Sequence, residues 1–325
     1  MESKHVTPGV SLTRLGLGTA QLGNLHRETT EDEVSETIST AWNSGIRYFD
    51  TAPHYGLGLS ERRVGKELSA YPRDEFVLST KVGRLLIESP STAHERDSQG
   101  FDVPADLVRE WDFSRSGILR SVESSLQRMG MDRIDVLYLH DPENHFEQAS
   151  TEGIQTLIEL REQGVVGAVG AGMNFAAPLA ELIRRADIDV VMCAGRFSLL
   201  DSEALEELMP LALERKVGIV AAGIYNSGLL SRGRPSADAK FNYEQAPADL
   251  ILRAQAVADI CSNFGISLPE AAMAYVQRHP AVVSVVVGAR GKTQVLENIS
   301  RAEARVPDAL WAELDSRGLI EEFEK

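Results

Sequence analysis

Cysteine is scarce in this chain, and long apolar runs are absent: Cys193 and Cys261 are its only cysteines. Two cysteines are too few for a disulfide framework, and their spacing is not that of metal ligands, so no metal site is expected. No stretch approaches the ~20 consecutive apolar residues of a membrane span. Residues 1–11 lack the apolar run after basic residues that marks a signal peptide. We therefore expect a cytoplasmic protein with no membrane partner.

Basic side chains are also few relative to acidic ones. The chain has 33 Lys and Arg against 48 Asp and Glu, a formal net charge of -15. The resulting field repels nucleic acids and anionic membranes, so neither is an expected partner. A phosphate-bearing cofactor stays open, because it needs only a local group of donors. The oligomeric state is left open by these numbers.

Short apolar, β-rich runs alternate with amphipathic helical stretches along the chain. The runs lie at residues 15–19, 47–49, 76–80, 134–139, 165–169, 190–193, 217–220 and 282–287. Strands that are apolar on both faces are typical of a parallel sheet covered by helices. Eight such units with no linker rich in Pro, Gly or Ser predict a single (β/α)8 (TIM) barrel domain over residues 1–325.

Two of the helices have clear start signals. Residues 31–43 carry apolar side chains on one face, and Thr30 with Glu33 predicts a capping box. Residues 115–129 follow Ser114, a favoured N-cap, and precede Gly130, a favoured helix exit.

Two segments interrupt the alternation, one after the third strand (residues 85–113) and one after the seventh (residues 223–245). Long loops in compact domains are usually functional or mobile. Both leave the carboxyl ends of strands, which is the face where barrel enzymes have their sites.

Four polar residues lie at or just beyond the ends of predicted strands two to four: Asp50, Tyr55, Lys81 and His140. Each of them alone is better explained as a solvated loop residue. A lysine directly after an apolar strand, however, is either paired or functional. Since these strands are neighbours in a barrel, the four side chains are predicted to converge.

Hydride transfer explains why these four residue types belong together. Reducing a carbonyl requires a proton for the resulting alkoxide, and the reverse reaction requires a base. The phenol of Tyr55 can do either, although its ordinary pKa of ~10 is high for neutral pH. A nearby Lys81 ammonium is expected to lower that pKa. Asp50 would hold the lysine, and a neutral His140 would orient the substrate oxygen.

The motifs that carry these residues are Asp-Thr-Ala-Pro-His-Tyr-Gly from Asp50, Ser-Thr-Lys-Val-Gly around Lys81, and Asp-Val-Leu-Tyr-Leu-His up to His140. They resemble the signatures of the aldo-keto reductases, and the resemblance runs from Leu15 to about Ala302. It implies a barrel that binds NAD or NADP, with these four residues as its catalytic tetrad.

A narrower likeness is to the D-threo-aldose 1-dehydrogenase branch, which includes L-fucose dehydrogenases. It is carried by the residues that follow Ala52, by the stretch from Gly167 to Asn174, and by the run from Val286 to Arg290. It implies oxidation of the anomeric carbon of an aldose to a lactone. The alternatives are L-galactose or pyridoxal dehydrogenases and an aldehyde or ketone reductase. A non-enzymatic cofactor-binding subunit is disfavoured by the complete tetrad.

The expected cofactor site begins at the Gly-rich turn after the eighth strand, where a helix start would offer amides to phosphate. By resemblance, the cofactor contacts are Gly18, Thr19, Asp50, Asn174, Tyr225, Gly288, Ala289, Arg290, Gln294 and Asn298. Tyr225 would stack on the nicotinamide, or it simply packs its loop. Some NADP-specific relatives carry cations at the places of Gly288 and Gln294, so NAD is slightly favoured. NADP stays open, because Arg290 or Lys292 would be able to bind its extra phosphate.

The candidate substrate residues are His54, Trp111, Phe113, Arg196 and Asn226. Aromatic faces with a few hydrogen-bonding groups suit a sugar ring. For Trp111, a role as an apolar anchor of its loop is an equal alternative.

Overall fold

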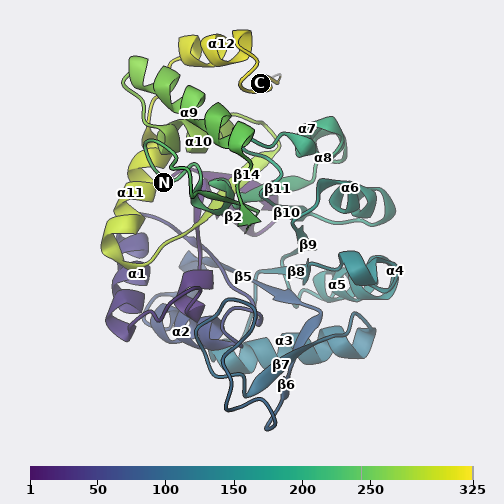
Figure 1. The fold of residues 1–325 in the computed structure, drawn as a ribbon. Helices are drawn as coiled ribbons and strands as arrows, with labels where there is room; N and C mark the ends of the chain where they lie inside the picture. Colours follow the sequence, from purple (N-terminus) through teal and green to yellow (C-terminus); the bar gives the residue numbers. More distant parts are fainter. Residues whose placement is uncertain (243, 324–325) are drawn as a thin grey trace.

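A closed barrel forms the centre of the molecule. The computed structural model describes residues 1–242 and 244–323. Eight parallel strands close in the order β10-β11-β14-β3-β4-β5-β8-β9, with helices around them (Figure 1). These strands are β3 (Leu15–Gly18), β4 (Tyr48–Asp50), β5 (Val77–Val82), β8 (Val136–His140), β9 (Ala168–Met173), β10 (Val190–Ala194), β11 (Gly218–Ala222) and β14 (Val282–Gly288). Each overlaps one of the eight apolar runs, so the predicted (β/α)8 fold is confirmed.

The helices occupy the stretches between the strands. They are α1 (Glu31–Asn43), α2 (Leu59–Leu68), α3 (Arg115–Met129), α4 (Phe146–Gln148), α5 (Ile154–Glu162), α6 (Ala176–Arg185), α7 (Glu203–Glu206), α8 (Leu208–Arg215), α9 (Ala248–Asn263), α10 (Leu268–Gln277), α11 (Gly291–Glu303) and α12 (Asp308–Ser316). The capping box of Thr30 and Glu33 is present, and Ser114 accepts the Gly117 amide at the start of α3. No helix within the described ranges is long and apolar enough to cross a membrane.

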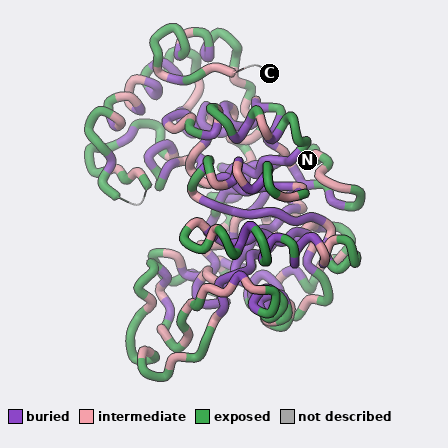
Figure 2. The backbone as a smooth tube through the Cα atoms, turned by 90° about the vertical axis from the view of Figure 1, so that its right-hand side faces the viewer, coloured by how far each residue is buried: buried purple, intermediate pink, exposed green. Residues whose placement is uncertain are grey.

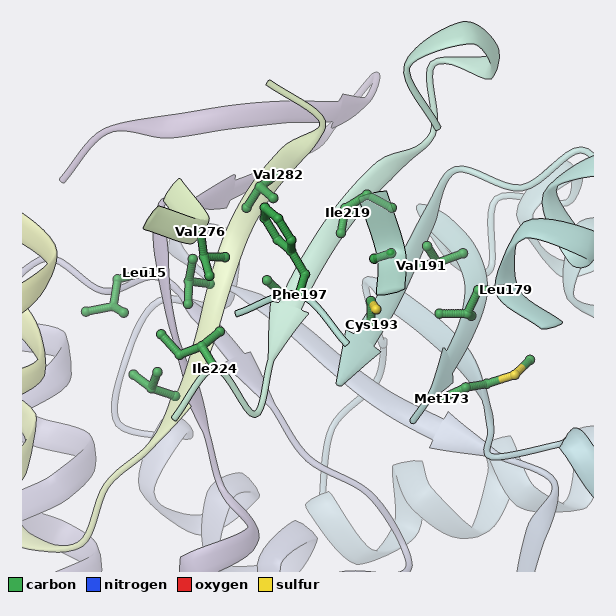
Figure 3. Packing of buried hydrophobic residues seen from close by; sticks show 14 of the residues in the cluster. Leu15, Met173, Leu179, Val191, Cys193, Phe197, Ile219, Ile224, Val276 and Val282 are labelled. Carbon is green, nitrogen blue, oxygen red and sulfur yellow. The ribbon is translucent and has the colours of Figure 1, made fainter. Parts of the chain in front are cut away.

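Apolar side chains fill the layer between the barrel and its helices. Leu15, Val191 and Ile219 on strands face this layer, and Leu179 and Val276 meet them from helices (Figure 3). The buried backbone lies in the middle of the molecule, while exposed residues lie along its outer surfaces (Figure 2). This burial on both faces explains why the strands read as nearly continuous apolar runs.

An N-terminal hairpin, which was not predicted, closes the amino-terminal end of the barrel. It consists of β1 (Ser3–Thr7) and β2 (Val10–Thr13), paired antiparallel. Val10 and Leu12 pack against side chains inside the barrel, including Tyr48 and Tyr138. Thr7 Oγ1 and Lys4 Nζ donate to carbonyls at the starts of β9 and β14. The barrel is therefore plugged at this end, and its open mouth is at the opposite one.

The two long segments contain short antiparallel hairpins, so they are more ordered than loops. The first holds β6 (Arg84–Glu88) paired with β7 (Leu107–Trp111). The second holds β12 (Lys240–Phe241) and β13 (Glu244–Gln245). Tyr243, which belongs to the second segment, lies outside the described residues.

Candidate active site

Three of the four predicted catalytic side chains meet through one ammonium group. Lys81 Nζ donates to Asp50 Oδ2 at 2.7 Å, to the Tyr55 hydroxyl oxygen at 3.1 Å, and to the Thr51 carbonyl at 3.0 Å. An ammonium has three protons, so all of its donors are used. The Asp50 and Lys81 side chains are each only 3% exposed, which makes this a buried ion pair. The predicted proximity of the phenol and the ammonium is thus present in the structure.

The register of β4 and β5 explains how these residues meet. Asp50 at the end of β4 pairs with Ser79 on β5. Side chains two residues apart on a strand share a face, so Ser79 and Lys81 both point toward Asp50. Ser79 Oγ donates to Asp50 Oδ1 at 2.7 Å and also lies 3.1 Å from the Tyr48 hydroxyl. The carboxylate is therefore held on both oxygens.

The pKa of Tyr55 differs from the sequence expectation. Burial raises the pKa of Tyr55 above its usual value, and the lowering by Lys81 offsets this only in part. For Lys81, burial would lower the pKa, but the charges of Asp50 and Tyr55 outweigh it and the net pKa is raised. At neutral pH the pair is therefore a phenol beside an ammonium. The sequence revealed the neighbouring charge but not the desolvation that exceeds its effect.

His140 lies at the end of β8 beside the phenol, with 6.1 Å between the ring centroids of Tyr55 and His140. Burial, followed by the charges of Arg84 and Lys81, lowers the pKa of His140 well below its usual value. The imidazole is thus neutral, as predicted. Among the described residues, its Nδ1 has no hydrogen-bond partner.

His54 is a second neutral imidazole at the mouth. Its ring centroid is 5.5 Å from that of His140 and 5.2 Å from that of Phe101. Burial and the charges of Arg84 and Arg109 lower its pKa to about 2. His54 Nδ1 also lacks a partner within the described part of the chain. The structure therefore brings this predicted substrate residue next to the tetrad.

A groove opens at the carboxyl ends of β11 and β14. It measures about 630 Å³ and runs between residues 21–26 and residues 223–240. Tyr225, Gly288, Gln294 and Asn298, four of the predicted cofactor contacts, line it. Asn298 is buried and donates to the Gly288 carbonyl at 3.3 Å, which joins α11 to the end of β14. Polar groups of this kind along an extended groove fit a dinucleotide.

The comparisons with known proteins agree with this geometry. A model of the aldo/keto reductase family matches residues 14–318. The chain belongs to the aldo/keto reductase family. It is 45% identical to the D-threo-aldose 1-dehydrogenase of a Pseudomonas species, over 98% of each protein. It is 36% identical to the pyridoxal 4-dehydrogenase of Microbacterium luteolum, over 96% of each. The solved glycerol dehydrogenase of Gluconobacter oxydans, 23% identical, superposes with a TM-score of 0.78 over 97% of this chain and 94% of that one, which supports the fold.

As an aldo/keto reductase, the chain is an oxidoreductase whose family implies a nicotinamide cofactor. Gly288, at the end of β14, has no side chain that could contact a phosphate, and Gln21 lies over it. A Cβ on Gly288 would lie 2.2 Å from Gln21 Oε1. The Gln21 side chain therefore occupies the space over this strand end.

Arg290 and Ala289 make contacts within the protein that the sequence did not predict. Arg290 Nε donates to Thr29 Oγ1 at 2.8 Å, and Nη2 donates to the Leu25 carbonyl at 2.7 Å. Ala289 is buried in the core, and neither residue lines the groove. The Arg290 guanidinium thus fastens the loop before α1, and phosphate binding by these two residues stays a prediction.

Gly18 and Thr19 make contacts that hold the strand ends of the site in place. Thr19 is fully buried, and its hydroxyl donates to the Asp50 carbonyl at 2.8 Å. Gly18 pairs with Asp50 and with Gly288 across β4 and β14. These contacts fix the strand ends that carry the tetrad, and direct cofactor contacts by Gly18 and Thr19 remain predictions.

A second cavity, of about 410 Å³, adjoins the groove and collects three predicted residues. It is lined by Asn174, Arg196 and Asn226, and Asn226 lines the groove as well. Arg196 is engaged by Asp201 and Asn242, each at 2.7 Å. These residues line a cavity, and their contacts with the substrate or the nicotinamide remain predictions.

Phe113 is not placed as predicted for a substrate contact. Its ring is fully buried and packs against Gly83, where a Cβ would lie 2.1 Å from Phe113 Cε1. Gly83 has a φ of +96°, so both its backbone and its missing side chain are required here. Phe113 anchors the first long segment, which corrects the prediction. Trp111, by contrast, lies beside polar groups of the mouth.

Those polar groups include charged residues that the sequence analysis missed. Arg84 forms an ion pair with Asp141. Arg109 pairs with Asp97 at 2.6 Å, and its guanidinium also donates to the His54 carbonyl at 3.0 Å. The signal was present: Arg84 follows Lys81 by three residues, and Asp141 follows His140 directly. Each directly follows one of the motifs that identified the tetrad.

Proposed function

We propose that this aldo/keto reductase is an aldose 1-dehydrogenase that oxidises the anomeric carbon of an aldose to a lactone with NAD. The observation that carries the proposal is the contact of Lys81 Nζ with both Tyr55 and Asp50, which provides a proton acceptor at the barrel mouth. The choice of an aldose is supported by the 45% identity to a D-threo-aldose 1-dehydrogenase over nearly all of both chains.

The proton path follows from the contacts of Tyr55. When bound, an oxidised nicotinamide would supply the hydride acceptor for the anomeric carbon. The hydroxyl proton of that carbon passes to the Tyr55 oxygen in its phenolate form, and the new carbonyl is that of the lactone. Lys81 stabilises the phenolate through its short contact. His140, being neutral, donates or accepts at the substrate oxygen without competing for the proton.

NAD is proposed over NADP on the lining of the groove. Gly288 offers no cationic side chain, and the Arg290 guanidinium is engaged by a loop. Arg301 forms an ion pair with Glu297 at 3.1 Å, which makes that cation less available.

The test is a matrix of initial rates on the pure protein. NAD and NADP are each combined with L-fucose, D-arabinose, L-galactose and pyridoxal, and the reduced cofactor is followed by absorbance. We expect the highest kcat/KM with NAD and an aldose, together with a lactone product. Absence of turnover on every aldose would remove the proposed substrate class. A higher kcat/KM with NADP would remove the proposed cofactor preference alone.

A reductase acting on an aldehyde or ketone is the second candidate, and one observation favours it. Burial keeps Tyr55 as a phenol at neutral pH, which is the form that donates a proton to an alkoxide. Rates measured from both sides at neutral pH decide between the two directions. Pyridoxal is the substrate named for a relative at 36% identity, so it belongs in the same comparison.

A cytoplasmic location is proposed as well. Cys193 and Cys261 are both free and buried, as suits a reducing compartment. Fractionation of cells that produce the protein tests it.

A further inference from the structure

We propose that the Arg84–Asp141 ion pair, with the Trp111 ring beside it, binds two neighbouring hydroxyl groups of a polyhydroxylated substrate. This diol-binding pair would make the enzyme prefer sugars to simple aldehydes. The inference deepens the proposed function, on which it rests for the position of the reacting carbon next to Tyr55 and His140.

The ion pair lies directly beside His140 at the barrel mouth. Asp141 directly follows His140, and its Oδ2 lies 3.6 Å from His140 Nε2. Arg84 opens β6, three residues beyond Lys81 on the neighbouring strand end. When the reacting oxygen of a sugar contacts His140, the hydroxyls on the next carbons lie a few ångströms away. The carboxylate of Asp141 is therefore placed to meet them.

The ion pair keeps hydrogen-bonding groups that no other residue fully uses. A carboxylate has about four lone-pair positions, and that of Asp141 is contacted by Arg84 and, at 3.5 Å, by Asn174. Arg84 donates to Asp141 through Nη2, and among the described residues its Nη1 makes no hydrogen bond. This second guanidinium nitrogen is left to donate to a ligand. A hydroxyl that donates to Asp141 and a neighbouring one that accepts from Arg84 would satisfy both groups.

Neighbouring side chains hold the ion pair in a fixed position. The Arg84 guanidinium lies 4.9 Å from the centroid of the Trp111 ring, which orients its plane. Trp111 ends β7, and the buried Arg109–Asp97 pair fastens this hairpin to the His54 carbonyl. The side chains of Arg84 and Asp141 are 9% and 18% exposed, so they are shielded yet reachable. Such partial burial strengthens hydrogen bonds to a neutral ligand.

The experiment compares two unreactive probes. The first is an anhydro sugar alcohol, a pyranose ring with no hydroxyl on its anomeric carbon. The second is the same ring without the hydroxyls on the next two ring carbons. Binding to the protein with bound NAD is measured by calorimetry for the wild type, Asp141→Asn, Arg84→Lys and a control, Asp74→Asn. Asp74 precedes β5, at the opposite end of that strand from Lys81, where it pairs with Arg133 and is exposed.

We expect both mouth variants to bind the first probe roughly 10- to 100-fold more weakly than the wild type, as for the loss of a charged hydrogen bond. The KM for an aldose should rise to a similar extent, with a much smaller change in kcat. The second probe should bind weakly and equally to all four proteins. NAD affinity and thermal unfolding report whether each variant is folded, and Arg84→Lys keeps the charge if Asp141→Asn fails to fold.

Equal affinity of the wild type for both probes would overturn the proposal, and so would unchanged binding in the two mouth variants. The outcome is separable from that of the proposed function. If the wild type distinguishes the probes yet oxidises no aldose, the diol-binding pair stands and the aldose dehydrogenase does not. If it oxidises aldoses and the variants keep the wild-type KM, only the diol-binding pair falls.

Discussion

Replacing Lys81 by Met tests the central contact of the site. Lys81 Nζ lies 3.1 Å from the Tyr55 oxygen, and both groups are shielded from bulk water. At an effective dielectric constant of about 20, an ammonium and a phenolate at that separation attract by roughly 5 kcal/mol. An attraction of this size corresponds to a phenol pKa about 4 pH units lower than it would be without the ammonium.

The variant should therefore hold far less phenolate than the wild type at any given pH. We expect kcat/KM for aldose oxidation at pH 8 to fall by about 10,000-fold, with activity recovering as the pH rises. Aldehyde reduction, which uses the phenol, should fall less. Steady-state rates in both directions between pH 6 and 10, as ordinary assay conditions, supply the measurement.

A stability measurement separates this effect from damage to the core. Without Lys81, the Asp50 carboxylate keeps its hydrogen bond from Ser79 but loses its counter-ion, and this costs about 3–5 kcal/mol in unfolding free energy. The matched double variant Asp50→Asn with Lys81→Met removes both charges and should regain much of that stability. It should stay as inactive in oxidation as the single variant. Wild-type oxidation rates in either variant at neutral pH would refute the assigned role of the ammonium.

Three further outcomes are expected. Tyr55→Phe should keep its affinity for NAD, measured by fluorescence, and lose kcat by roughly 100- to 10,000-fold; unimpaired turnover would exclude Tyr55 as the acid or base. Because the pKa of Tyr55 is raised, the rate of wild-type aldose oxidation should increase with pH from neutral to about 10. The rate of reduction should stay constant with rising pH and then decline. A bell-shaped oxidation profile centred below pH 7 would contradict this expectation. Gly83→Ala should lower the free energy of unfolding, measured by urea denaturation, by about 2–4 kcal/mol, because it combines a positive φ with the clash against Phe113. The control Gly9→Ala, with a φ of +91° and open space around it, should lower it by only about 1 kcal/mol. Equal losses in the two variants would show that the clash is relieved.

The tetrad was predictable because sequence order and spatial order coincide in a barrel. Asp50, Lys81 and His140 end the neighbouring strands β4, β5 and β8, so the ends of three apolar runs lead to one place. The helices α1 and α3 were predictable from local caps. Both predictions depend on short stretches of chain and on a repeating architecture.

Features set by distant contacts were not predictable in this way. Arg290 donates to Leu25 and Thr29, more than 260 residues away, and nothing in the Gly-rich turn indicates this. Phe113 is buried because Gly83 lacks a side chain, although its polar surroundings in the sequence favoured the mouth. For Tyr55, the sequence shows the neighbouring charge, while the degree of desolvation depends on the folded mouth.

The N-terminal hairpin has a consequence for biosynthesis. In the hairpin, Lys4 donates to the carbonyl of Val282, near the end of the chain. The strand that follows the hairpin, β3, pairs with β14, which is also formed late in the sequence. The first strands to leave the ribosome therefore find their last partners only when nearly the whole polypeptide has emerged. Until then, the nascent sheet has two unpaired edges, at β3 and β11, that invite association with other chains. Truncations that remove β14 should accordingly aggregate during translation, whatever happens at the catalytic mouth.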